Sequence, residues 1–267
     1  MILRSGLAAP DASGGTTGTF YSWDRPVINN NGDVIVWAQL QGTPGGLTDS
    51  SGLFVGNGTT LRQIVRSGDP APDGNGRLQI FGRNAIINDA GQTAFQTSHT
   101  GAVGRTVGGI YFYDPKLGLM TVARNGQDLL GGTLSSLMLA GNNLDTPVGD
   151  METSGLNQHG QVAFQFQLTS GAQGLAIWSP PNSDFNDDGV VNGDDLAVLT
   201  ANYGKTPATL ADGDGNGDNV VDGMDFMYWQ RQAAGASAEQ ARTIPEPATA
   251  LSAVLAIPFF CCACRRV

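Results

Sequence analysis

Cysteine is almost absent from this 267-residue chain, and the three that occur all lie in its last seven residues. Because Cys261, Cys262 and Cys264 are confined to that end, the rest of the chain has no possible internal disulfide. A secreted domain of this size does not need one. The length gives room for one sizeable domain and a second, small one.

Residue types that commonly carry catalysis are scarce as well. Only two histidines occur, His99 and His159, and only three glutamates. No GxSxG, HExxH or Gly-Lys-Ser/Thr phosphate loop is present. A glycosidase needs two opposed carboxylates, and nothing singles out a pair among the candidates, which are Asp24, Asp69, Asp145, Asp150 and Glu152. We therefore expect no enzyme, with a cryptic glycoside hydrolase as the less favoured alternative.

Charged residues make up only 14% of the chain, and they are unevenly distributed. Residues 184 to 225 hold ten Asp, no Glu and one basic residue, Lys205, which is a net charge of −9. The whole chain carries −10, so the other 225 residues sum to about −1. With no basic patch and a pI near 4.4, nucleic acid is not an expected partner. Acidity this concentrated is typical of a site that divalent cations neutralise.

Two stretches of the acidic segment place oxygen-bearing residues at the spacing of a calcium-binding loop. The first is DFNDDGVVNGDD, in which Gly189 takes position six and a valine at position seven offers its main-chain carbonyl. The predicted ligands are Asp184, Asn186, Asp188, Val190, Asn192 and Asp195. The second, DGNGDNVVDGMD, repeats the pattern thirty residues later with Asp214, Asn216, Asp218, Val220, Asp222 and Asp225. We expect this loop to be the weaker one, because Asn219 replaces glycine at position six.

Each loop leads into apolar residues at helical spacing. They are Leu196, Leu199 and Tyr203 after the first loop, and Phe226, Trp229 and Ala233 after the second. Two such loop-helix units resemble a type I dockerin module. The resemblance covers roughly Asp184 to Gln232 and implies two bound Ca²⁺ ions and a cohesin-like protein partner. An acidic linker is the structural alternative. If calcium does bind, we expect the module to be largely unfolded without it.

The dockerin resemblance is weaker at loop positions ten and eleven. Partner choice in dockerins resembles a code at these positions, usually Ser/Thr or similar. Here they are Gly193-Asp194 and Gly223-Met224, which puts cohesin recognition in doubt.

Residues 1 to 180 form an internal repeat array. Its clearest marks are units of an asparagine turn followed by a strand, at Ile28–Leu40, Ile87–Ser98 and Leu156–Leu168. Two of them read NxxGxxAF, at Asn88–Phe95 and Asn157–Phe164, and resemble the NxxGxxAF tandem-repeat family of bacterial surface proteins. The Asn and Gly of these turns supply positive φ at low cost.

The repeats predict a mainly β fold with about four antiparallel strands per unit, either as propeller-like blades of an incomplete propeller or as stacked sheets or a sandwich. A small α-helical calcium module and one C-terminal membrane helix are expected to follow. The predicted domains are 1–180 (repeats), 181–234 (calcium module), 235–243 (flexible spacer) and 244–267 (sorting signal).

The C-terminal segment combines a Pro-Glu-Pro motif, an apolar run of about 17 residues and terminal arginines. The run, Ala248–Cys264, is at the short limit for crossing a bilayer, and the arginines would stay cytoplasmic. The motif residues are Pro245, Glu246, Pro247, Arg265 and Arg266. Together they resemble a PEP-CTERM sorting signal, which implies an exosortase-type enzyme as a partner and the inner membrane as the site before processing.

The N-terminus shows no signal peptide. LRSGLAAPDASG at Leu3–Gly14 instead echoes VRSGDPAPDGNG at Val65–Gly76, so we expect the chain to begin inside a repeat, with its export signal upstream.

The sequence thus predicts a non-catalytic, exported cell-surface or matrix protein whose repeats are available to a surface polysaccharide or another ligand. The alternative is a component of a polysaccharide-degrading assembly that docks through the calcium module.

Overall fold

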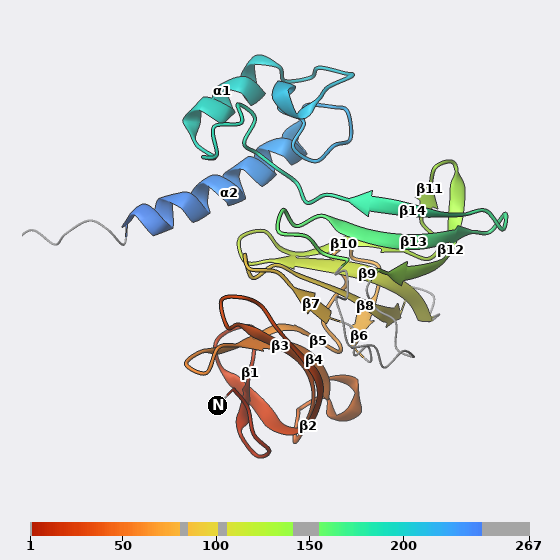
Figure 1. Ribbon diagram of the computed structural model, residues 1–267, viewed down its shortest axis with the longest axis vertical. Coiled ribbons are helices and arrows are strands. Elements are labelled where there is room, and N and C mark those ends of the chain that lie inside the picture. The colour runs from red at the N-terminus through yellow and green to blue at the C-terminus, as the bar shows by residue number, and fades with distance from the viewer. Residues whose placement is uncertain (1, 81–84, 101–105, 141–154, 242–267) are drawn as a thin grey trace, which may run out of the picture.

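The structure is a computed structural model that describes residues 2–80, 85–100, 106–140 and 155–241. Antiparallel strands build most of it, and two helices follow near the C-terminal end (Figure 1). The expectation of a mainly β fold is confirmed. The predicted sorting signal, residues 244–267, lies outside the described residues.

The strands form three sheets that follow one another along the chain. The first has the order β1 (Ala8–Pro10), β2 (Thr16–Ile28), β3 (Val34–Gln41), β4 (Ser51–Gly56) and β5 (Leu61–Arg66). The second has the order β10 (Gly118–Arg124), β9 (Thr106–Asp114), β8 (Thr93–Thr100) and β6 (Arg77–Gln79), with β7 (Ala85–Ile87) also paired to β8. The third has the order β11 (Asp128–Leu129), β12 (Gly132–Leu139), β13 (Val162–Leu168) and β14 (Gln173–Trp178).

Each sheet is built on one of the asparagine turns found in the sequence. The turns precede β3, β8 and β13, and their glycines, Gly32, Gly91 and Gly160, have φ of +83°, +74° and +77°. Positive φ is favourable for glycine because it has no Cβ. The turn chemistry predicted from the sequence is therefore confirmed.

The sheets are stacked, with an apolar layer between each pair (Figure 1). Ile35, Leu53 and Val55 of the first sheet pack against Phe95 and Tyr111 of the second. On the other side of the second sheet, its remaining apolar residues meet those of the third, including Ala94, Ile110, Phe112, Phe164 and Phe166. The central sheet is thus covered on both faces by apolar side chains of its neighbours.

The first sheet curls on itself, and β1 lies against β5 as well as pairing with β2. Inside the curl, Phe20 and Phe54 meet edge to face with ring centroids 4.9 Å apart. This closes the outer face of the first sheet, where Ala9, Leu3 and Leu7 also pack.

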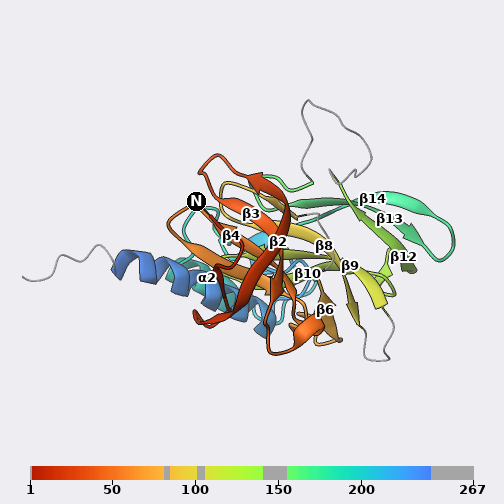
Figure 2. The same ribbon diagram turned by 90° about the horizontal axis from the view of Figure 1, so that it is seen from below.

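Two helices, α1 (Gly193–Ala201) and α2 (Gly223–Ala241), form a small module beyond β14, with a short 3₁₀ segment at Leu210–Asp212 between them (Figure 1 and Figure 2). Another 3₁₀ segment, Gly46–Thr48, lies between β3 and β4 of the first sheet. Helix α2 extends through residues 235–241, so the prediction of a flexible spacer over 235–243 is wrong as far as Ala241. Alanine at five of the positions from 233 to 241 explains this, because alanine has the highest helix propensity. In the described part of the chain, neither helix is long and apolar enough to cross a membrane.

Candidate functional site

The first acidic loop folds around its two end carboxylates. Asp184 accepts hydrogen bonds from the backbone N–H groups of Asp188 (3.1 Å) and Gly189 (2.8 Å). Asp195, which is fully buried, accepts from the N–H groups of Phe185 (2.7 Å), Asn186 (3.3 Å) and Asn192 (2.8 Å). These bonds fold the loop around the carboxylates of its first and last positions.

The second loop repeats this arrangement. Asp214 accepts from the N–H groups of Asp218 (3.2 Å) and Asn219 (2.8 Å), the residues at loop positions five and six. Asp225, also fully buried, accepts from Gly215 (2.9 Å), Asn216 (3.2 Å) and Asp222 (2.8 Å). Each of these bonds has its counterpart thirty residues earlier. The two-fold repetition predicted from the spacing is therefore present in the folded loops.

Position six distinguishes the two loops, as predicted. Gly189 has φ of +83° in the first, and Asn219 has φ of +69° in the second. A non-glycine residue in the left-handed region is strained, although asparagine tolerates it better than most. The second loop therefore carries a conformational cost that the first does not.

Positions nine and twelve of each loop also begin a helix. The Asn192 side chain accepts from the N–H of Asp194 (2.6 Å), while Asp195 reaches back to the N–H of Asn192, which is a capping box. Asp222 and Asp225 make the same two bonds at the start of α2, with Asp222 accepting from Met224 (2.7 Å). Each helix therefore starts at loop position ten, three residues before the first residue of its apolar pattern.

A small apolar core ties the two units together. It contains Phe185, Leu199, Ala208 and Val221, and the Trp229 indole N–H donates to the carbonyl of Asn192 (2.7 Å). The predicted apolar stripe is only partly correct, because Tyr203 is 63% exposed. With so few buried side chains, the core contributes little toward holding ten Asp together.

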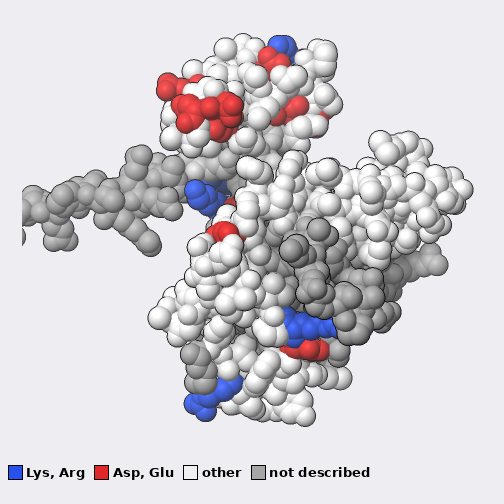
Figure 3. Space-filling view, viewed as in Figure 1, with Lys and Arg blue, Asp and Glu red and all other residues white. Residues whose placement is uncertain are grey.

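Electrostatics act against the second loop in the absence of a cation. Burial raises the pKa of the Asp225 carboxyl, and the charge of Asp214 raises it further, while three backbone N–H bonds lower it. Acidic side chains also gather over the helical module in Figure 3. The ionised form of Asp225 is therefore costly in the buried loop.

The donors of both loops are oxygens, which suits a hard divalent cation. Within the described part of the chain, however, no three His, Cys, Asp or Glu side chains gather closely enough to hold a metal by themselves. A cation in the first loop would also need the amide oxygen of Asn186 and the carbonyl of Val190. A cation in the second loop would need those of Asn216 and Val220. Because a carboxylate has about four lone-pair positions, its backbone hydrogen bonds leave acceptor capacity for an ion.

A second functional feature, a ladder between the asparagine turns, was not predicted. The Asn29 side-chain amide donates to the carbonyl of Asn88 (2.9 Å), and the Asn88 amide donates in turn to the carbonyl of Asn157 (2.9 Å). Meanwhile each side-chain oxygen accepts an N–H of its own turn, as Asn88 does from Gln92 (3.0 Å). A side-chain amide can do both because its nitrogen donates while its oxygen accepts. The recurrence of Asn at intervals of 59 and 69 residues was the signal available in the sequence.

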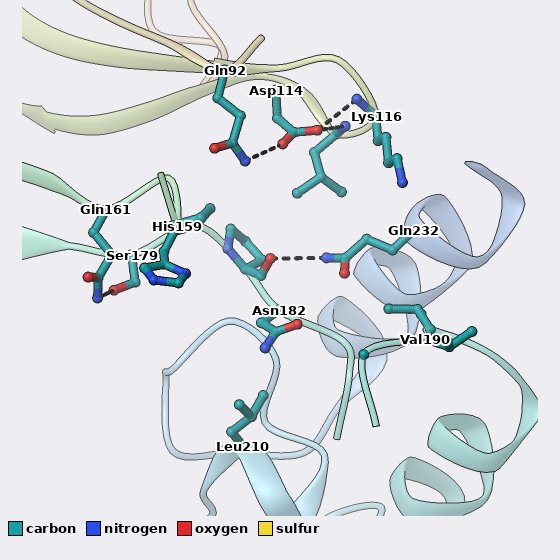
Figure 4. Close-up of a pocket in the computed structure, with 15 residues that line it drawn as sticks. Gln92, Asp114, Lys116, His159, Gln161, Ser179, Asn182, Val190, Leu210 and Gln232 are labelled. Carbon is teal, nitrogen blue, oxygen red and sulfur yellow. Dashed lines mark hydrogen bonds between the residues drawn. The ribbon is translucent and has the colours of Figure 1, made fainter. Parts of the chain in front are cut away.

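A cleft of about 870 Å³ separates the turn end of the sheets from the helical module (Figure 4). Gln92, Asp114 and His159 line one side, and Val190 and Gln232 line the other. Several of its polar groups bind one another, with Gln92 donating to Asp114 (2.9 Å) and Gln161 to Ser179 (3.1 Å). No Phe, Tyr or Trp is among the described residues that line it, and His159 supplies the one imidazole ring among them. The first acidic loop thus borders the repeats through Val190.

His99 is buried in β8. Its Nδ1 lies 2.8 Å from the Tyr111 hydroxyl. Burial lowers the pKa of His99 and raises that of Tyr111. This pair sits in the layer beside the first sheet and not in the cleft. The candidate carboxylates Asp145, Asp150 and Glu152 lie outside the described residues.

These observations define a class of protein: stacked antiparallel sheets joined by an asparagine ladder, followed by a helical module with two matching acidic loops. The chain belongs to a family of unknown function, DUF7453, whose model matches residues 1–181. No curated protein and no solved structure matches the chain. The match ends where the acidic module begins.

Proposed function

We propose that this is a non-catalytic, calcium-stabilised protein of the cell surface or extracellular matrix, sorted by an exosortase-type enzyme. The observation that carries the calcium part is the correspondence of the two loops, in which the same backbone groups bind the carboxylates at positions one and twelve. An acidic linker has no reason to fold twice into one arrangement. Two Ca²⁺ ions would neutralise four of the nine net negative charges of residues 184–225.

The chemistry assigned to calcium is structural. Bound ions would offset the repulsion among Asp184, Asp188 and Asp195, and among their counterparts in the second loop. Because loop one borders the cleft through Val190, its ordering would also support the position of the module against the repeats. In this proposal the sheets act as propeller-like blades that display a surface for a polysaccharide or another ligand.

Calorimetric titration of Ca²⁺ into the full chain tests the calcium proposal. We expect two ions per chain, one ion for Asp195→Asn, and two for the control Asp194→Asn. The control carboxylate is exposed and lies one residue away, at loop position eleven, so it removes the same charge without removing a predicted ligand. No binding at millimolar Ca²⁺, or equal binding by all three proteins, would refute the proposal.

Circular dichroism with a chelator checks the structural role. Removal of calcium should reduce the helical signal, because the small apolar core cannot hold the acidic loops alone. The signal should return on adding Ca²⁺ but not on adding an equal concentration of Na⁺. A helical signal unchanged by chelator would show that backbone hydrogen bonds to Asp195 and Asp225 suffice.

The sorting part rests on the sequence. Replacement of Pro245-Glu246-Pro247 by three alanines should retain the protein at the inner membrane, whereas wild type reaches the surface and is cleaved by protease added to intact cells. Protection of the wild-type protein from that protease would contradict export.

The alternative proposal is a docking role toward a cohesin-like partner. The paired loops and helices favour it, whereas Gly193-Asp194 and Gly223-Met224 at the positions that select a cohesin do not. Capture of a cohesin-bearing protein by the full chain, lost in Asp195→Asn, would replace the structural proposal with this one.

A further inference from the structure

A fully buried histidine lies in the layer between the first and second sheets. His99 is a cross-strand neighbour of Leu78 in β6, and its Nδ1 lies 2.8 Å from the Tyr111 hydroxyl. The Tyr111 ring lies against Gly109, where a Cβ atom would come within 2.9 Å of it. Among the described residues, the Nε2 of this histidine has no hydrogen-bond partner. A buried nitrogen without a partner is uncommon in folded proteins, because it costs free energy.

The loop between β5 and β6, residues 67–76, packs against this pair of rings. Its Ala71 belongs to the same apolar cluster as Tyr111. Its Asp73 forms an ion pair with Arg124 of β10, in which Oδ2 and Nε are 2.6 Å apart. The charges of both partners of this ion pair act on the pKa values of the histidine and the tyrosine, so the ion pair lies close to the two rings. The β5–β6 loop is thus held on the second sheet where the histidine is buried.

Protonation of His99 would leave more buried groups without a partner. When the neutral ring accepts from the Tyr111 hydroxyl at Nδ1, only the Nε2–H lacks an acceptor among the described residues. In the protonated ring both nitrogens carry a hydrogen. Nδ1 must then donate to the tyrosine oxygen, and the tyrosine hydrogen loses its acceptor. Two buried donors are unpaired instead of one, and the ring also carries a charge that burial disfavours.

The charged groups around His99 do not compensate for this cost. The Asp73 carboxylate favours the protonated ring, but it is already paired with Arg124, whose own charge disfavours it. Burial raises the pKa of Tyr111, so the tyrosine stays neutral and supplies no negative charge. The remaining charged residues at the two ends of the β5–β6 loop bind backbone groups, and they are Arg66, Asp69 and Arg77.

We propose that His99 and Tyr111 form an acid-sensitive latch that holds the β5–β6 loop against the second sheet. The neutral histidine fits the closed layer. In acid the proton is bound more strongly when the loop opens and water reaches Nε2, so the equilibrium shifts toward the open loop. The latch lies within the repeats, so it operates whether or not the acidic loops bind calcium.

The size of the effect follows from proton linkage. Burial lowers the pKa of His99 below its ordinary value of 6.5, and opening restores that value. The closed state therefore loses stability as pH falls from about 6.5 toward the lower pKa of the closed state. Between pH 7.5 and pH 5.5 the equilibrium constant for opening should rise by up to about tenfold, because over this interval the open state gains a proton that the closed state does not bind.

Hydrogen exchange of the full chain, measured by mass spectrometry in excess Ca²⁺ at pH 7.5 and pH 5.5, tests the proposal. The reporters are the N–H groups that bond within the β5–β6 loop or between it and β6, those of Gly68, Ala71 and Leu78. After correction for the intrinsic effect of pH, their exchange should rise by up to about tenfold at pH 5.5, while β13 keeps its protection. No rise would overturn the proposal. An equal rise in β13 would also overturn it, because the whole stack would then be opening.

The chain offers a matched control, since its only other histidine, His159, is exposed. His99→Asn keeps an acceptor for the Tyr111 hydroxyl but cannot be protonated, so loop exchange should be the same at both pH values. His159→Gln should respond to acid as wild type does. An acid response that persists in His99→Asn, or that disappears in His159→Gln, would refute the assignment.

Histidine ring resonances of the wild-type protein provide a test that needs no variant at the buried position. One ring, that of His159, should titrate near the ordinary pKa of 6.5, whereas the His99 ring should stay neutral in the closed state down to pH 5.5. Titration of both rings near 6.5 with no change in loop exchange would show that the layer accepts the charged histidine, and the latch would be excluded.

Discussion

The asparagine ladder makes a sharp prediction about Asn88. This residue is 3% exposed, and its side-chain amide donates to Gln92 Oε1 (2.7 Å) and to the carbonyl of Asn157 (2.9 Å). The Asn88→Asp change keeps the size and the oxygen that accepts from the Gln92 N–H. It removes both donors and places a carboxylate beside two acceptor oxygens. Two lost hydrogen bonds at about 1 kcal/mol each, with about 1 kcal/mol for an unpaired buried acceptor, give a loss near 3 kcal/mol.

The chain supplies its own control at Asn157. This asparagine has the same place in the last turn, but it is exposed and its amide donates within that turn, to Gln161 (2.8 Å). The Asn157→Asp change should therefore cost less than about 1 kcal/mol.

Urea unfolding of the full chain in excess Ca²⁺, followed by tryptophan fluorescence, measures both changes. With a slope of about 2 kcal/mol per molar urea, Asn88→Asp should lower the midpoint by about 1.5 M. Equal shifts for the two variants would show that the turns, and not the contacts between repeats, need the amide. The ladder would then contribute nothing measurable to stacking.

Three further predictions concern single residues. Asn219→Gly should relieve the strain of a positive φ of +69° in the second loop. Calorimetry should then show Ca²⁺ binding to that loop with a binding free energy more favourable by up to about 1 kcal/mol. Weaker binding would mean that the asparagine side chain itself contributes. Trp229→Phe keeps an aromatic side chain but removes the 2.7 Å hydrogen bond to the Asn192 carbonyl. The Ca²⁺ affinity of the first loop should therefore fall by up to about tenfold. An unchanged affinity would show that α2 does not support that loop. Burial raises the pKa of Asp69 above its ordinary value of 3.8, so folding disfavours the ionised carboxylate. The free energy of unfolding therefore falls as pH rises from 3.8 through the higher pKa of the folded state. Gln127 accepts from the Arg124 N–H as Asp69 accepts from the Arg66 N–H, so Asp69→Gln copies the equivalent turn. This variant should therefore lose less stability than wild type over that pH rise in urea titrations at several pH values. Parallel pH profiles for the two proteins would refute the assignment.

Much of the local structure could be predicted because it depends on neighbours in the chain. A twelve-residue loop needs a sharp turn at position six, so Gly189 and Asn219 were identifiable from spacing, and both adopt positive φ. The asparagine turns were predictable for the same reason, since Gly32, Gly91 and Gly160 adopt a positive φ that residues with a Cβ disfavour. The helix start was predicted less well, because Asn192 and Asp222 cap their helices within the loops themselves.

Contacts between distant residues could not be read in the same way. Tyr203 fits the helical pattern of Leu196 and Leu199, yet it is exposed, because α1 ends at Ala201 and Tyr203 lies beyond its C-cap, Asn202. The spacer prediction failed because its small polar composition was given more weight than the helix propensity of its alanines.

The sequence by itself determined the repeats, the mainly β fold, the two acidic loops and the reason for their turns, because each depends on periodicity or on the conformational freedom of one residue. Only the tertiary structure decided which side chains face another sheet. Leu53, Ile110 and Leu175 occupy the same register position in similar strands, and two are buried while one is exposed. The amides of Asn29 and Asn88 likewise find their acceptors 59 and 69 residues away. Burial and long-range hydrogen bonds depend on what lies across a layer, and the stacking of the sheets sets that.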